Sequence, residues 1–153
     1  MDIIFDIDGT LVNLDHRVHF VKQDKPDWAS FENGIKDDTI IPEMRSLLIS
    51  IASDKNNRLI FCTGRKETTR GDTLDQLNRI TDGIKNLEPT TNFPLYMRSI
   101  NDFRPDPDVK SDLYDQMLDD GFKPVIVFDD RSSVVNMWRS RGVRCLQCAP
   151  GNF

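Results

Sequence analysis

Five short apolar runs alternate along the chain with longer segments in which apolar residues recur at helical spacing. The runs cover residues 2–6, 59–62, 94–97, 123–128 and 143–146, and they lack the alternation of a half-exposed strand. Unbroken apolar runs of this kind are typical of strands that are buried on both faces of a sheet. Because strands alternate with helices, the pattern predicts an α/β fold with a mostly parallel central sheet flanked by helices.

The segments between the runs predict helices with recognisable starting residues. Pro42 is suited to the first position of one helix, and Asp106 can cap another that has Pro107 at its first position. Ser132 or Ser133 can cap the last helix. The apolar positions at helical spacing are Met44, Leu47, Leu48 and Ile51, then Leu74, Leu77, Ile80 and Ile84, then Val109, Leu113, Met117 and Leu118, and finally Val135 and Trp138.

One segment, residues 11–41, does not fit this alternation. It is too long for an ordinary connection between two elements and too polar to form core. We expect a small helical lid inserted after the first strand. Trp28 and Phe31 could stack on a nucleobase, although such aromatic residues more often form the small core of a lid. The lid contains Leu14, His16, His19, Phe20, Trp28 and Phe31.

Composition narrows the class of protein. The chain has 153 residues with a formal net charge of −5, so we expect one domain over residues 1–153 and no basic-patch DNA binder. No run approaches the roughly 18 apolar residues of a membrane span, and the acidic N-terminus does not resemble a signal peptide. Its 3 cysteines cannot form a disulfide framework. These features favour a cytoplasmic protein.

Acidic and phosphate-binding residue types follow the predicted strands. Asp6 and Asp8 lie two residues apart at the end of the first strand, so both can face one site. The second strand is expected to end at Thr63-Gly64-Arg65, which offers a hydroxyl, a bare backbone N–H and a cation to phosphate oxygens. Lys110 lies in the helix after the third strand, and Asp129-Asp130-Arg131 follow the fourth. Because sites in parallel sheets form at the carboxyl ends of strands, the acids predict a Mg²⁺ site there.

These residues, in this order, resemble the four motifs of the haloacid dehalogenase (HAD) superfamily of phosphohydrolases. DIDGT resembles the first motif, Thr63 the second, Lys110 the third and Asp129-Asp130 the fourth. The resemblance covers the whole chain and implies a Rossmann-like HAD fold.

A closer similarity is to the 3′-phosphatase domain of phage polynucleotide kinase/phosphatases. It rests on HRVHF and KPDW in the lid, on MRSINDFRPDPDVK, and on FDDRSSVVNMWRSRGVRCLQCAPGNF. A GxxxxGK[ST] phosphate loop does not occur in this sequence, so we expect a phosphatase without the kinase half. The resemblance implies a bacteriophage protein, and a phage-encoded protein of this kind would act in the host cytoplasm.

The resemblance also implies residue roles. Asp6 would attack phosphorus and form an aspartyl-phosphate, while Asp8 would protonate the leaving oxygen and then activate water. Mg²⁺ would be held by Asp6, by the backbone carbonyl of Asp8 and by Asp130, with Asp129 either a direct ligand or one layer further out. Lys110 would bridge the phosphate and Asp6, and Thr63 would join the catalytic group.

Several further residues are candidate contacts with substrate. For the two arginines next to the acids, local ion pairs are an equal alternative. For the arginines of the MRSINDFRPD segment, a surface role is an equal alternative, and for the lid residues internal packing is the favoured one. The candidates are Gly64, Arg65, Arg131, Arg98, Arg104, His16 and Arg17, beside Thr63 and Lys110.

The similarity favours a Mg²⁺-dependent phosphomonoesterase that removes the 3′-phosphate from nucleic-acid ends. The alternative is a 5′(3′)-deoxyribonucleotidase, since the net acidity suits a small nucleotide better than a polymer. A third hypothesis is a phosphate-binding or repair-scaffold module without catalysis. The expected partner is a phosphorylated nucleic-acid end or a nucleotide, with no membrane and no obligatory protein partner indicated.

Overall fold

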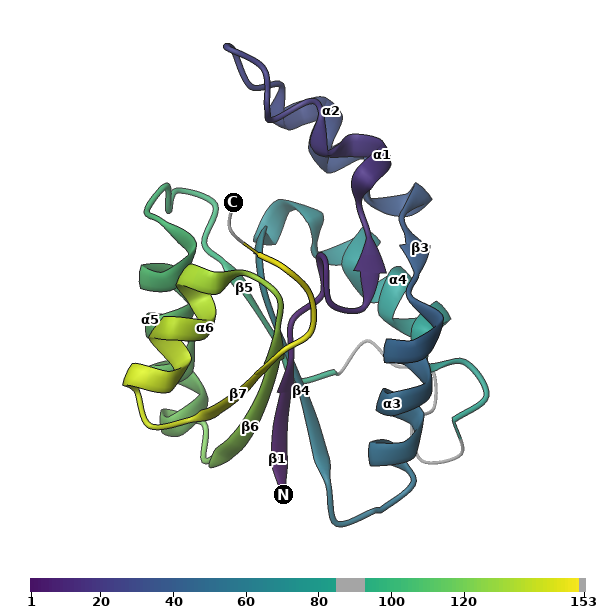
Figure 1. Cartoon of the computed structure of the whole chain (residues 1–153), viewed down its shortest axis with the longest axis vertical. Coiled ribbons are helices and arrows are strands. Elements are labelled where there is room, and N and C mark those ends of the chain that lie inside the picture. The colour runs from purple at the N-terminus through teal and green to yellow at the C-terminus, as the bar shows by residue number, and fades with distance from the viewer. Residues whose placement is uncertain (85–92, 152–153) are drawn as a thin grey trace.

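The structure, a computed structural model, describes residues 1–84 and 93–151, and a parallel sheet forms its centre (Figure 1). In the described residues the sheet has 5 strands in the order β5-β4-β1-β6-β7, and each neighbouring pair is parallel. The predicted α/β fold is therefore confirmed. The strands are β1 (Asp2–Phe5), β4 (Arg58–Lys66), β5 (Leu95–Arg98), β6 (Pro124–Asp129) and β7 (Arg144–Gln147).

Helices cover both faces of this sheet, as Figure 1 shows. The core on one face joins Ile3 and Phe5 of β1 to the pair α3 and α4. The core on the other face joins Ile4 to α5 and α6. Successive residues of β1 thus point into two separate cores, which explains why its sequence is apolar without alternation. The helices are α3 (Pro42–Ala52), α4 (Arg70–Thr81, preceded by the short η2, Glu67–Thr69), α5 (Asp106–Asp119) and α6 (Ser132–Ser140).

Several element boundaries differ from the prediction. Strand β4 does not end at Thr63-Gly64 but continues to Lys66, because after a register shift Lys66 still pairs with Arg98 of β5. Helix α5 has Pro105 at its N-cap, so Asp106 is its first residue rather than its cap. Helix α6 likewise begins at Ser132 itself.

Three apolar positions of the predicted helices also lie elsewhere than expected. Leu47 and Leu118 are exposed, because each lies at the margin of the buried face of its helix. Ile84 is buried but follows the end of α4 at Thr81.

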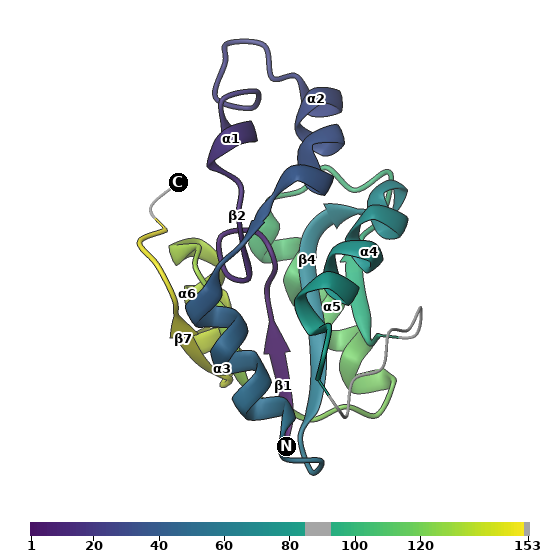
Figure 2. The same ribbon diagram turned by 90° about the vertical axis from the view of Figure 1, so that its right-hand side faces the viewer.

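The inserted segment rises from the carboxyl end of the sheet (Figures 1 and 2). Its base is a two-stranded antiparallel sheet in which Val12 faces Ile40 and Asn13 faces Thr39. The expectation that the whole insertion is too polar for core was wrong at its start, since Leu11 and Val12 are fully buried in the main core. Its elements are β2 (Val12–Asn13), α1 (Asp15–Val18), α2 (Trp28–Asn33), η1 (Gly34–Asp37) and β3 (Thr39–Ile40).

Two aromatic residues pack together in this insertion. The ring of Trp28 meets the ring of Phe31 edge-on at 6.0 Å between centroids, and the Arg17 guanidinium lies 4.3 Å from the centroid of Phe31.

None of the helices in residues 1–84 and 93–151 is long and apolar enough to cross a membrane.

Candidate active site

A buried lysine joins two aspartates at the carboxyl end of the sheet. Asp6 follows β1 directly, and Asp129 is the last residue of β6. Lys110, on the second turn of α5, places its Nζ 2.7 Å from Asp6 Oδ1 and 2.8 Å from Asp129 Oδ2. The Asp6 N–H donates to the Phe128 carbonyl at 3.0 Å, which fixes the two strand ends side by side. Three elements distant in sequence therefore present one ionic cluster.

A third carboxylate completes this cluster. One oxygen each of Asp6, Asp129 and Asp130 lies within 4.8 Å of the others. Both oxygens of Asp129 already accept hydrogen bonds. Its Oδ1 accepts from the Arg131 N–H at 3.2 Å. Its Oδ2 accepts from Lys110 Nζ at 2.8 Å and from Trp138 Nε1 at 3.2 Å. This arrangement favours Asp130 over Asp129 as a direct metal ligand.

Glycine at position 9 makes room for the Asp130 carboxylate. A Cβ atom at Gly9 would lie 2.2 Å from Asp130 Oδ2, and the φ of Gly9 is +81°. Both the contact and the left-handed backbone exclude an ordinary side chain here. The turn after β1 is therefore shaped to hold Asp130 close to Asp6.

The electrostatics of the cluster suit a divalent cation. Burial raises the pKa of Asp6 well above its ordinary value, and Asp129 and Asp130 raise it further against the opposing effect of Lys110. Burial and Asp129 likewise raise the pKa of Asp130 to about 6. Lys110 itself stays protonated, because Asp129 and Asp6 raise its pKa more than burial lowers it. One ammonium thus faces three carboxylates, and divalent metals such as Mg²⁺ prefer such oxygen ligands.

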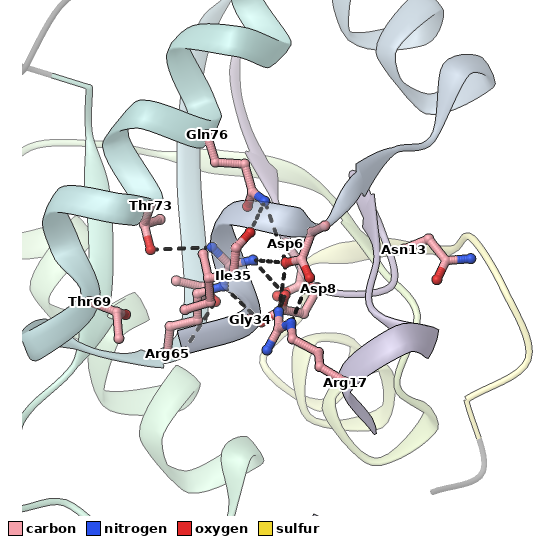
Figure 3. Close-up of polar contacts among 12 residues, drawn as sticks. Asp6, Asp8, Asn13, Arg17, Gly34, Ile35, Arg65, Thr69, Thr73 and Gln76 are labelled. Carbon is pink, nitrogen blue, oxygen red and sulfur yellow. Dashed lines mark hydrogen bonds and ion pairs between the residues drawn. The ribbon is translucent and has the colours of Figure 1, made fainter. Parts of the chain in front are cut away.

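Asp8 belongs to a second ionic cluster, shown in Figure 3. Arg65 donates through Nε and Nη2 to the two Asp8 oxygens at 2.9 and 2.6 Å, and Arg17 Nη2 donates to Oδ1 at 2.7 Å. Both arginines also bind Asp38, a fully buried residue at the end of the insertion. Arg17 donates to its two oxygens at 2.6 and 2.7 Å, and Arg65 donates to it at 3.0 Å. The insertion and the sheet are therefore joined by four charged groups.

The two guanidinium groups determine the ionisation of Asp8. Burial would raise its pKa, but Arg65 and Arg17 outweigh that effect and lower the pKa to about 2. Asp8 is consequently a carboxylate at neutral pH. It differs in this respect from Asp6, two residues earlier, whose pKa is raised.

This geometry favours the ion-pair alternative for Arg65 and the packing alternative for Arg17 over contact with substrate. The Arg17 side chain is 0% exposed and that of Arg65 only 3% exposed, so both serve to hold Asp8 in place. Asp38 is a site residue that the sequence analysis missed. Gln76 of α4 supports it at 3.4 Å, and also donates to the Ile35 carbonyl at 2.9 Å.

The second motif forms the wall next to this cluster. Thr63 is buried, and its Oγ1 accepts from the Arg65 N–H at 3.2 Å. A Cβ atom at Gly64 would lie 2.5 Å from Asp106 Oδ1, so only glycine leaves this backbone accessible beside that carboxylate. Asp106 binds both Arg98 and Arg131, the latter at 2.7 Å. Arg98, Asp106 and Arg131 therefore form an ionic rim beside Gly64, in which Asp106 was predicted only as a helix cap.

Two of the predicted substrate contacts have partners outside the cluster of Asp6, Asp129 and Asp130. Arg104 is half-exposed and forms ion pairs with Asp102 and Asp112, each at 2.7 Å. His16 approaches the Gly34 carbonyl at 3.2 Å and Asp38 at 3.6 Å, within the insertion. Both observations favour the surface and packing alternatives for these residues.

Replacing Asp38 tests the second cluster. In Asp38→Asn, Arg17 and Arg65 lose the buried one of their two carboxylate partners, so we expect the free energy of unfolding to fall by about 3–5 kcal/mol. Asp37→Asn is the matched control, because it removes the same charge one residue earlier at an exposed position. Urea denaturation of both variants measures the difference, and equal losses in the two would contradict a structural role for Asp38.

Comparison with known proteins places the chain among phosphatases. A family model described as the polynucleotide kinase PNKP phosphatase domain matches residues 1–153. Two structures of a Pnkp1/Rnl/Hen1 complex, one titled an RNA repair complex, match 99% of this chain at TM-scores of 0.77 and 0.76 and identities of 24% and 25%. The chain spans only 43% and 47% of those relatives.

A more distant likeness extends to acid phosphatases. The structure of the class C acid phosphatase from Bacillus anthracis with tungstate bound matches this chain at a TM-score of 0.66 and 13% identity. The match covers 99% of this chain and 66% of the acid phosphatase chain. Similarity at this level of identity concerns the fold.

Proposed function

Because the chain belongs to the family of polynucleotide kinase PNKP phosphatase domains, within the HAD superfamily, we propose that this phosphatase removes the 3′-phosphate from nucleic-acid ends. The observation that carries the proposal is the cluster of Asp6, Lys110, Asp129 and Asp130 at the carboxyl end of the sheet. It joins a candidate nucleophile to a cation and to ligands for a metal.

Asp6 is the proposed nucleophile, which attacks phosphorus to give an aspartyl-phosphate. A carboxylate that approaches a phosphate dianion is repelled by about 4 kcal/mol per charge pair at ~4 Å and an effective dielectric constant near 20. The Lys110 ammonium, the Thr63 hydroxyl and the Gly64 N–H would offset this repulsion and stabilise the transition state. Mg²⁺, which Asp6, the Asp8 carbonyl and Asp130 would hold, supplies further positive charge when bound.

Asp8 is the proposed group for proton transfer. In the free protein it is ionised, which is the state required to accept a proton from the water that hydrolyses the aspartyl-phosphate. In the first step it must instead carry a proton for the leaving oxygen. A phosphate dianion beside Asp8 favours that protonation, because added negative charge raises the pKa of a carboxyl group.

The insertion over residues 11–41 is proposed as a lid on one side of this site within a single domain. It rises from the carboxyl end of the sheet (Figure 2), the end to which Asp6 and Asp129 belong, and Arg17 fastens it to Asp8 at 2.7 Å. The lid is small, so we infer that it leaves the site open to a longer substrate.

The experiment that tests the proposal compares phosphate release from three substrates. They are an oligonucleotide with a 3′-phosphate, a free 3′-mononucleotide and a free 5′-mononucleotide. We expect the oligonucleotide to have the highest kcat/KM. Activity confined to 5′-mononucleotides would instead favour the nucleotidase, and binding of the oligonucleotide with no turnover would favour a scaffold module. Pairs of DNA and RNA oligonucleotides with one sequence determine which polymer is preferred.

Removal of the metal should abolish activity. Chelation with EDTA leaves Lys110 as the one cation among the three carboxylates of the cluster, so we expect phosphate release to fall by at least about a thousandfold, equivalent to one uncompensated charge pair. Excess Mg²⁺ should restore it, and EDTA saturated with Mg²⁺ beforehand is the control for the chelator itself. Mg²⁺ should also raise the Tm of the wild type more than that of Asp130→Asn. Full activity after exhaustive chelation would contradict the metal role.

A further inference from the structure

The loop over residues 99–105, between β5 and α5, displays an aromatic side chain to solvent. Phe103 is 79% exposed, the highest value among the exposed large hydrophobic residues of the described ranges. Burial of a phenylalanine side chain stabilises a protein by about 1.5–3 kcal/mol, and this loop forgoes that gain. A requirement of folding therefore does not account for the position of Phe103.

Hydrogen bonds hold this loop in one conformation. Arg98, the last residue of β5, donates through Nη1 to the carbonyls of Asp102 and Arg104 at 3.3 and 2.7 Å. The Asp102 N–H donates to the Ser99 carbonyl at 3.1 Å, and the Arg104 N–H donates to Asp102 Oδ1 at 3.0 Å. Phe103 is thus presented by an ordered loop, which lowers the entropy cost of binding something to its ring.

The surroundings of the ring suit a nucleobase joined to a phosphate. Lys66 Nζ lies 4.6 Å from the centroid of the Phe103 ring, where a cation interacts favourably with the aromatic face. A shallow pocket of about 520 Å³ adjoins the ring, and Ser99 and Asn101 give it hydrogen-bonding groups. An aromatic face next to a cation is the combination on which single-stranded nucleic acids stack their bases.

The loop is also connected to Gly64, whose N–H is a proposed phosphate contact. Arg98 Nε donates to the Gly64 carbonyl at 2.9 Å, so the residue that shapes the loop also contacts the second motif. Lys66 follows Gly64 by two residues on the same strand, and pairs with Arg98 in the sheet. A nucleotide whose phosphate lies at Gly64 could therefore extend toward Phe103.

We propose that Phe103, with Lys66 beside it, is a stacking site for the nucleobase at the phosphorylated end of the substrate. This inference rests on the proposed function. The site would select ends that carry a base over simple phosphate monoesters, and it would act through KM more than through kcat, since the ring does not touch the reacting atoms.

Kinetics with an abasic substrate test this site. We expect Phe103→Ala to raise KM for a 3′-phosphorylated oligonucleotide by about 5- to 100-fold, the equivalent of one lost stacking interaction. Phe103→Tyr should retain the wild-type KM. Neither variant should change KM for the same oligonucleotide with an abasic terminal residue. The control is Leu118→Ala, which truncates an exposed apolar residue outside this loop, on α5. An equal loss on both substrates, or no loss on either, would overturn the proposal.

A binding measurement separates this site from the proposed activity. An oligonucleotide with 2-aminopurine at its 3′-phosphorylated end is mixed with the Asp6→Asn variant, in which turnover is blocked. Stacking on Phe103 should quench the fluorescence, and the quenching should be absent from Asp6→Asn combined with Phe103→Ala. The same oligonucleotide with a 3′-hydroxyl, and the free mononucleotide, show whether phosphate and polymer contribute. Equal quenching in both proteins would overturn the stacking site, whatever the turnover assays find.

Discussion

The Asp6→Asn variant is expected to release phosphate at no more than about one thousandth of the wild-type rate, because an amide cannot attack phosphorus. The loss should appear in kcat and should persist at saturating substrate and Mg²⁺. Acid quenching of the wild type with a substrate labelled in its terminal phosphate should recover label on the protein, and the variant should carry none. Unchanged turnover would contradict the assignment of Asp6 as the nucleophile.

The stability of Asp6→Asn should not fall with its activity. Asp6 is a buried carboxyl group whose pKa is raised by burial and by Asp129 and Asp130, so its ionised form is costly in the folded protein without metal. An amide of the same shape removes that cost while still accepting a hydrogen bond from Lys110. We therefore expect Asp6→Asn, in the absence of metal, to unfold at a urea concentration equal to or above that of the wild type. A lower midpoint would mean that the pair with Lys110 outweighs the repulsion among the acids.

The second large effect is expected at Lys110. Its ammonium is 2.7 Å from Asp6 and 2.8 Å from Asp129, and all three side chains are buried. In Lys110→Met the carboxylates lose this buried cation, so we expect the free energy of unfolding to fall by about 3–5 kcal/mol and turnover to be lost. Urea denaturation and phosphate release measure the two effects.

A surface variant and a metal titration sharpen this test. Lys55→Met removes the same charge at an exposed position and should change stability by less than about 0.5 kcal/mol. Saturating Mg²⁺ should raise the Tm of Lys110→Met more than that of the wild type, because the cation then replaces the missing charge. If the two lysine variants were equally stable, the buried cluster would not depend on Lys110.

Residues at strand ends could be predicted from the sequence because a parallel sheet brings its carboxyl ends together. Asp6 ends the first apolar run, and Thr63 and Asp129 directly follow the second and the fourth, so topology places all three near one edge even though β4 continues past Thr63 to Lys66. Lys110 was found through the family resemblance, and its helix brings it to the same edge. These predictions did not require knowledge of any side-chain contact.

The partners of Asp8 could not be predicted in this way. Arg17 and Asp38 meet only because the insertion leaves the sheet at β2 and returns at β3, and no periodic pattern specifies that path. Asp38 stands beside Asp37 in the sequence, yet one is buried and the other exposed. The extension of β4 to Lys66 was missed for a similar reason, since it depends on a shifted pairing with Arg98.

The fastening of the insertion to Asp8 has a consequence for timing. Because Arg17 and Asp38 both belong to the insertion, a swing of the insertion away from the sheet would separate Arg17 from Asp8 and Asp38 from Arg65, contacts of 2.7 and 3.0 Å. Asp8 would then keep Arg65 but lose Arg17, one of the two guanidinium groups that lower its pKa. Under the proposed mechanism, the motion that admits or discards a strand end would therefore change the proton affinity of Asp8 at the same moment.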